Sequence, residues 1–168
     1  AFFAFPRHRF LPDTPYNEVY QNKSVVTKRM GRGSVSSATK PGVVAVMLEQ
    51  LDLERGHRVL EIGTGTGYNC ALISHIVGPN GHVVSVDIDP QVVERARKNL
   101  AQFALENLRL ICSDGWHGIP TEIPYDRIIC TVGLNDIPGF WINQLADDGV
   151  FLFPLWIRNG VQRTIAFR

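Results

Sequence analysis

Three glycines at alternate positions, Gly63, Gly65 and Gly67, lie between a predicted strand and a predicted helix. Glycine allows the backbone to turn sharply there and to approach a ligand closely. The spacing differs from the dinucleotide-binding fingerprint, which requires a small residue at position 68, where this chain has Tyr68. No Gly-Lys-Ser/Thr follows the loop, so it also differs from a phosphate-binding P-loop. The loop therefore predicts a ligand site of another kind.

Carboxylates accompany this loop at neighbouring predicted strands. Glu61 lies in the strand before the loop, Asp87 ends the next strand along the chain, and Asp114 follows the one after that. Because ligands of open α/β sheets bind at the carboxyl ends of the strands, we expect these side chains around one site. Helix capping or turn formation is the alternative for Asp87 and Asp114, since Asp is common in turns after strands. Their joint occurrence with the glycine loop favours a binding site.

The elements that must position these residues alternate between strands and helices from residue 41 onward. This alternation predicts an α/β fold, a doubly wound and mostly parallel sheet with helices on both faces and an antiparallel terminal hairpin turning at Asn159-Gly160. Residues 1–40 lack sustained periodicity, and we expect a short helical start followed by an irregular loop. The predicted strands cover 58–62, 82–86, 108–112, 126–131, 150–155 and 162–167, and the predicted helices cover 68–77, 91–105 and 140–145, with one more beginning at Pro41.

The motif Glu61-x-Gly-x-Gly-x-Gly67 resembles the first motif of class I S-adenosylmethionine methyltransferases. The resemblance implies that the loop packs against the amino-acid part of the cofactor, and that Asp87 accepts both ribose hydroxyls. It also implies that Ile88 covers the adenine and that Asp114 binds the adenine amino group. Glu61 either orients the cofactor through the loop backbone or is simply a charge at a strand end. The implied cofactor-binding residues are Glu61, Gly63, Gly65, Gly67, Asp87, Ile88, Asp114 and Gly115.

The whole chain, beyond the cofactor motifs, resembles the protein-L-isoaspartate O-methyltransferase family. Residues 6–12 are similar to the family's Pro-Arg-x-x-Phe-Val-Pro segment, and residues 37–41 stand where the family carries Thr-Ile-Ser-Gln-Pro. Further similarity runs through residues 124–129 and 145–154. The resemblance implies that the hydroxyls of Thr39 and Ser37 hold the acceptor carboxylate, with capping of the following helix as the alternative. It implies S-adenosyl-L-methionine as cofactor, S-adenosyl-L-homocysteine as product, and a methyl ester that can close to a succinimide.

The expected acceptor is an aspartyl or isoaspartyl carboxylate in a protein, or an acidic precursor peptide. Lys40 replaces the family's Gln, and the segment 25–29 with the following Gly/Ser stretch resembles the branch that modifies ribosomally made peptide natural products. That branch is the favoured interpretation. A housekeeping repair enzyme and a non-catalytic module that binds the cofactor or a peptide are the alternatives. We expect residues 1–40 to contribute to the substrate site and residues 41–168 to form the methyltransferase domain, within a single domain overall.

Composition and motifs argue against other partners. The Asn/Asp-Pro-Pro-Tyr/Phe motif of base-methylating enzymes is replaced by Thr-Val-Gly-Leu-Asn-Asp-Ile-Pro at 131–138, so no nucleic-acid partner is expected. No metal-ligand cluster and no apolar run of the ~20 residues that a membrane helix needs are found. Seven basic and two acidic residues in 1–40 suit an anionic partner or a solvated flank. Cys70, Cys112 and Cys130 form no CxxC pair, which favours buried thiols in a reducing cytoplasm.

Overall fold

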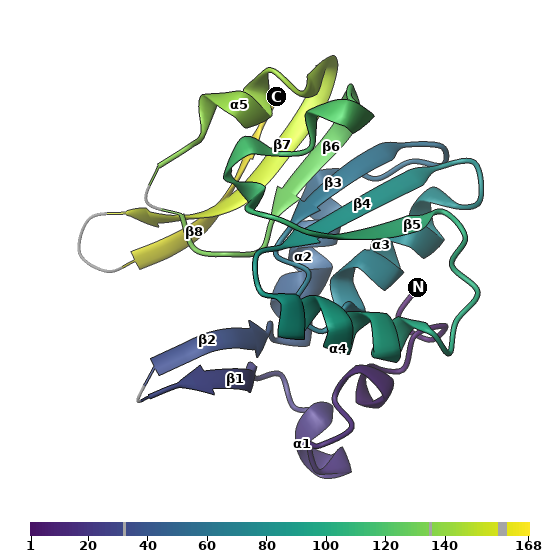
Figure 1. The fold of residues 1–168 in the computed structure, drawn as a ribbon, viewed down its shortest axis with the longest axis vertical. Coiled ribbons are helices and arrows are strands. Elements are labelled where there is room, and N and C mark those ends of the chain that lie inside the picture. The colour runs from purple at the N-terminus through teal and green to yellow at the C-terminus, as the bar shows by residue number, and fades with distance from the viewer. Residues whose placement is uncertain (32, 135, 158–160) are drawn as a thin grey trace.

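The computed structural model describes residues 1–31, 33–134, 136–157 and 161–168 and has a six-stranded sheet at its centre (Figure 1). The strand order is β5-β4-β3-β6-β7-β8; β3 to β7 run parallel, and β8 returns antiparallel to β7. This confirms the predicted α/β fold and its terminal hairpin, whose predicted turn at Asn159-Gly160 lies outside the described residues. The strands are β3 (Arg58–Ile62), β4 (His82–Asp87), β5 (Leu108–Cys112), β6 (Tyr125–Cys130), β7 (Leu145–Ile157) and β8 (Val161–Phe167).

The two faces of the sheet are covered unequally. Val59 and Leu60 are both buried but belong to opposite core clusters, because successive strand residues point to opposite faces. The cluster of Val59 includes residues from the three long helices, α2 (Pro41–Leu51), α3 (Tyr68–Val77) and α4 (Pro90–Leu100). On the Leu60 side the cover is shorter: the cluster includes Trp141 of α5 (Gly139–Ile142) and Ile119, which lies between the 3-10 turns η2 (Gly115–His117) and η3 (Pro120–Glu122).

Most predicted elements coincide with the structure, and the differences fall at their ends. The helix predicted to reach residue 105 ends at Leu100, because a turn follows it. Phe103 and Leu105 nevertheless pack on the core from that loop, which extends the apolar pattern beyond the helix. The helix predicted over 140–145 ends at Ile142, and β7 begins at Leu145, which pairs with Tyr125 of β6.

The main difference lies in residues 1–40, where the predicted irregular loop is wrong. Residues 25–38 form a separate two-stranded antiparallel sheet of β1 (Val25–Met30) and β2 (Gly33–Ala38), preceded by η1 (Arg7–Phe10) and α1 (Tyr16–Val19). The pairing register shifts on both sides of Lys28, so the strands show no simple alternation in sequence. We call residues 25–38 the hairpin.

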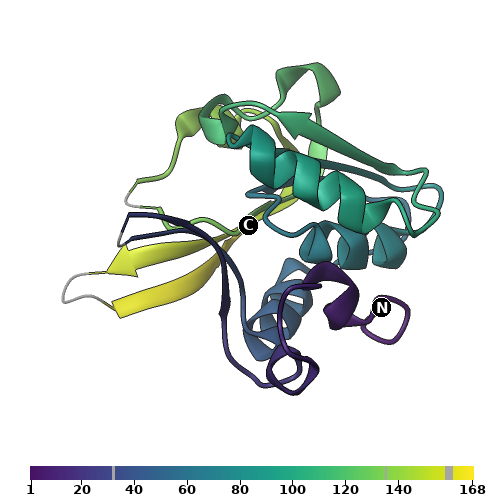
Figure 2. The same cartoon turned by 60° about the horizontal axis from the view of Figure 1, so that its bottom comes forward.

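The hairpin projects from the body of the molecule and is anchored to the beginning of α4 (Figures 1 and 2). Lys28 pairs with Asp89, the residue that caps α4, and Arg95 on α4 donates to the carbonyl oxygen of Thr27 at 3.1 Å. Both contacts join β1 to α4 and its N-cap. Among the described residues, no helix has the length and apolar content that a bilayer crossing needs.

Candidate functional site

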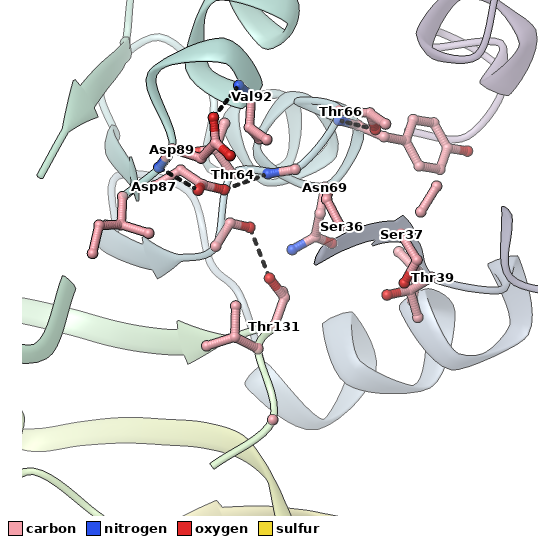
Figure 3. Close-up of a pocket in the computed structure, with 18 of the residues that line it drawn as sticks. Ser36, Ser37, Thr39, Thr64, Thr66, Asn69, Asp87, Asp89, Val92 and Thr131 are labelled. Carbon is pink, nitrogen blue, oxygen red and sulfur yellow. Dashed lines mark hydrogen bonds between the residues drawn. The ribbon is translucent and has the colours of Figure 1, made fainter. Parts of the chain in front are cut away.

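A cavity of about 400 Å³ lies between the carboxyl ends of the central strands and the hairpin. Figure 3 shows Asp87 and Asp89 on one side of it and Ser37 and Thr39 on the other. The sheet and the N-terminal segment therefore each provide part of the wall. The lining residues are Ser36, Ser37, Ala38, Thr39, Val44, Met47, Gly63, Thr64, Gly65, Thr66, Tyr68, Asn69, Asp87, Ile88, Asp89, Val92, Thr131, Val132 and Gly133.

The glycine loop forms the floor of this pocket with its backbone. Gly63 has a φ of +99°, and a Cβ there would lie 2.6 Å from the hydroxyl of Thr131. Gly65 has a φ of +55° and no atom within 4 Å of the position of a Cβ, so its backbone faces open space. Both conformations are ones that only glycine adopts readily. At Gly63 and Gly65 the loop thus presents peptide groups to whatever occupies the pocket, and Thr64 and Thr66 also line it.

Asp87 is held at the end of β4 by the loop that it faces. One carboxylate oxygen accepts from the amide of Gly65 at 3.1 Å, and the other accepts from the amide of Asp89 at 3.1 Å (Figure 3). A carboxylate offers about four acceptor sites, so these two bonds leave capacity for ligand hydroxyls. Ile88, beside it, is 67% exposed and presents an apolar side chain at the pocket rim.

Four of the eight predicted cofactor residues do not line the cavity: Gly67, Asp114, Gly115 and Glu61, the last of which lies behind the glycine loop. Asp114 is exposed and accepts from the amide of Trp116 at 2.9 Å, so it caps η2, as the alternative interpretation expected. Gly115 is buried, and a Cβ there would lie 2.8 Å from Ile62. Gly67 begins α3 and packs against α4. A direct cofactor contact by these residues stays a prediction.

Glu61 lies behind the glycine loop, fully buried. Its carboxylate accepts from the side-chain amide of Asn69 at 2.8 Å and from the hydroxyl of Ser85 at 2.5 Å. The Ser85 hydroxyl is in turn 2.7 Å from that of Thr64, and both Thr64 and Asn69 line the pocket. Glu61 thus holds pocket-lining side chains from behind, which favours an orienting function over a strand-end charge. Burial raises the pKa of Glu61 to about 7, with hydrogen bonds from Ser85 and Asn69 opposing the rise.

We expect Glu61→Gln to change how stability depends on pH. Because the pKa of Glu61 is raised from 4.5 to about 7, the native state binds more protons than the unfolded chain between these pH values. The contribution of Glu61 to the free energy of unfolding therefore falls as pH rises through that window. From pH 4.5 to pH 7.5, the free energy of unfolding of the variant, measured with urea, should rise by about 3 kcal/mol relative to that of the wild type. Glu106→Gln, at an exposed residue, is the control; an equal difference at both pH values for Glu61→Gln would contradict the expectation.

Asp89 is a pocket residue that sequence reasoning did not single out. It accepts from the amides of Gln91 and Val92 at 2.9 and 3.3 Å, and the hydrogen bond from Lys28 lowers its pKa. Asp followed by Pro90 at the first helical position is a recognisable start signal, so the cap could have been predicted. The partner on the hairpin could not, because Lys28 is 61 residues away in sequence.

The two predicted acceptor-binding residues both line the pocket. Ser37 and Thr39 lie at and just after the end of β2, with Thr39 partly buried and Ser37 exposed. Helix capping, the alternative for both, is wrong, because Lys40 is the N-cap of α2 and the Gly42 amide at its start donates to the side chain of Asn22 at 2.9 Å. Neither hydroxyl has a hydrogen-bond partner within the described part of the chain. Both are available to a ligand.

The cysteine prediction is correct in two places out of three. Cys70 and Cys130 are buried free thiols, and burial raises the pKa of Cys130 to about 12. Cys112 is exposed, because it ends β5 at the edge of the sheet. Within the residues that the structure describes, no group of His, Cys, Asp and Glu could hold a metal ion.

Comparison with known proteins agrees with this geometry. The family model of protein-L-isoaspartate(D-aspartate) O-methyltransferase matches residues 1–168. The chain belongs to this family. The predicted resemblance is thereby confirmed over the whole chain. A protein-L-isoaspartate O-methyltransferase of Thermotoga maritima is 38% identical over 156 residues, covering 92% of this chain and 49% of the relative. One from Archaeoglobus fulgidus is 41% identical over 150 residues, covering 89% of this chain and 66% of that relative.

Solved structures of the family share the fold. One called protein-L-isoaspartate O-methyltransferase has a TM-score of 0.90 at 36% identity, covering 99% of this chain and 53% of that chain. A Plasmodium falciparum structure in complex with S-adenosyl-L-homocysteine has a TM-score of 0.82 at 16% identity, covering 98% and 78%. The chain thus spans about half the length of the Thermotoga maritima relative and of the first of these structures. Both named relatives are isoaspartate enzymes, so they favour the repair alternative over the peptide-maturation branch.

Proposed function

We propose that this chain transfers the methyl group of S-adenosyl-L-methionine to the carboxylate of an isoaspartyl residue in protein substrates. The observation that carries the proposal is a single pocket in which the glycine loop and Asp87 face Ser37 and Thr39. The first pair suits the cofactor and the second suits the acceptor. Family membership over the whole chain supports the same assignment.

The cofactor is proposed to lie along the glycine loop. Its amino-acid part would contact the backbone of Gly63 and Gly65, Asp87 would accept the ribose hydroxyls, and Ile88 would cover the adenine. The support is that all four residues line one cavity. Gly67, Asp114 and Gly115 are proposed to complete the cofactor side of the pocket. Glu61 is proposed to orient the cofactor through Asn69.

The acceptor needs positioning more than activation. Carboxyl groups have unperturbed pKa values of about 3 to 4, so the acceptor is already an anionic nucleophile at neutral pH. An oxygen–carbon bond forms as the sulfur–methyl bond breaks, and the bonding electron pair stays on sulfur. The products are the methyl ester and neutral S-adenosyl-L-homocysteine. Thr39 and Ser37 are proposed to hold the carboxylate in line with the methyl group, since such alignment can supply up to about 7–11 kcal/mol of the barrier.

Within the chain, residues 1–40 are proposed to form the acceptor side and residues 41–168 the cofactor side. The hairpin supports this division, because its end lines the pocket opposite Asp87. Lys40 is exposed beside Thr39 and is proposed to attract acidic acceptor sequences. The free cysteines suit a reducing cytoplasm as the place of action.

The deciding experiment compares two peptides that differ only in whether one residue is Asp or isoAsp. Each is incubated with the protein and S-adenosyl-L-methionine, and mass spectrometry follows methyl gain or water loss at that residue. We expect modification of the isoaspartyl peptide alone. Modification of the aspartyl peptide alone would favour the peptide-maturation branch, and cofactor binding without turnover on either peptide would indicate a non-catalytic module.

A further inference from the structure

Arg7 is a buried cation that pairs with no carboxylate among the residues that the structure describes. It lies in η1, only 2% exposed, and donates to two backbone carbonyl oxygens: that of Val19 at 2.5 Å and that of Thr39 at 3.0 Å. Its Nε has no hydrogen-bond partner within the described residues. Burial lowers the pKa of Arg7, because removal from water disfavours the charged guanidinium.

Burying such a residue costs free energy. A cation transferred from water to a protein interior loses solvation that only well-placed acceptors offset, and an apolar side chain of similar length avoids this loss. A small apolar cluster of Leu11, Val19 and Ala38 already holds the N-terminal segment against the hairpin. Packing alone therefore does not account for an arginine at this position, whereas its two hydrogen bonds do.

One of these bonds fixes the acceptor side of the pocket from behind. Thr39 joins two anchored elements: Ala38 pairs with Val25 in the hairpin, and Pro41 begins α2. Between these anchors the Thr39 carbonyl accepts from Arg7, while its residue lines the pocket. We propose that Arg7 is a positioning residue, which holds the Thr39 backbone so that the Thr39 hydroxyl meets the acceptor carboxylate. This inference rests on the proposed function.

A double-mutant cycle tests it, using Arg7→Lys, Thr39→Ala and the combination. If Arg7 acts through Thr39, Arg7→Lys lowers kcat/KM for the isoaspartyl peptide by about tenfold, within the range of coupling between contacting residues. The loss falls mainly on the KM for the peptide, and calorimetry gives a Kd for S-adenosyl-L-homocysteine within about twofold of wild type. In the Thr39→Ala background, Arg7→Lys produces no further loss.

Arg9→Lys is the matched control, because Arg9 lies in the same turn but is exposed and contacts Gln102 instead. It should leave kcat/KM unchanged. Equal losses from Arg7→Lys in both backgrounds would overturn the inference and leave Arg7 as a residue of general stability. If Arg7→Lys fails to fold, as judged by its melting transition, the same cycle is run with Arg7→Gln. An inactive wild type would instead refute the proposed function, which keeps the two failures distinct.

Discussion

Asp87→Asn is expected to weaken binding of S-adenosyl-L-homocysteine by at least about 100-fold, equivalent to roughly 3 kcal/mol. The carboxylate is proposed to accept two ribose hydroxyls, and a hydrogen bond to a charged acceptor contributes about 1.5–3 kcal/mol. The amide keeps the size of the side chain but removes its charge and replaces one acceptor with a donor. Isothermal titration calorimetry of the purified variant gives the change in Kd directly.

Asp147→Asn provides the matched control, since Asp147 is exposed and lies outside the pocket-lining residues. It should bind the nucleoside as the wild type does. The Asp87 amide could also disturb the contacts to Gly65 and Asp89, so the melting temperature of each variant is measured alongside. A folded Asp87→Asn variant with a Kd within a few-fold of wild type would remove Asp87 from the cofactor site.

Thr39→Ala is expected to lower kcat/KM for an isoaspartyl peptide by about 10- to 100-fold, the loss of one hydrogen bond to a charged group. The affinity for S-adenosyl-L-homocysteine should stay nearly unchanged, because the hydroxyl faces the acceptor rather than the nucleoside in the proposed arrangement. Steady-state kinetics with the peptide and calorimetry with the nucleoside separate the two effects.

The conservative change Thr39→Ser retains the hydroxyl and should recover most of the activity. Ser37→Ala is expected to have a smaller effect, since Ser37 is more exposed than Thr39. If Thr39→Ala turns over the peptide at the wild-type rate, Thr39 does not hold the acceptor, and the inference about Arg7 fails with it.

The central sheet could be predicted because its signals are local. The strands at 58–62 and 108–112 are short segments rich in Val, Leu and Ile, and the helix at 68–77 is flanked by glycines. The hairpin could not be predicted in this way. Its register shifts around Lys28 interrupt the alternation that reveals a strand, and its second strand is rich in small residues.

The same distinction applies to the site. The glycine loop and Asp87 are recognisable because each motif is contiguous in sequence. The contacts of Glu61 with Ser85, of Lys28 with Asp89 and of Arg7 with Thr39 join residues 24, 61 and 32 positions apart. No periodicity records such pairs, since they depend on how separate elements pack. The sequence therefore predicts the residues that form the pocket floor, but not the long-range contacts that hold the pocket walls in place.

The division of the pocket between two parts of the chain has a consequence for acceptor preference. In the proposed arrangement, the loops at the strand ends meet the nucleoside, whereas the end of the hairpin meets the acceptor. In that arrangement, exchanging hairpin residues while Ser37, Thr39 and the anchors to α4 are kept would change which acceptors fit. Acceptor preference would then be varied within one short segment of the chain, separate from the nucleoside half.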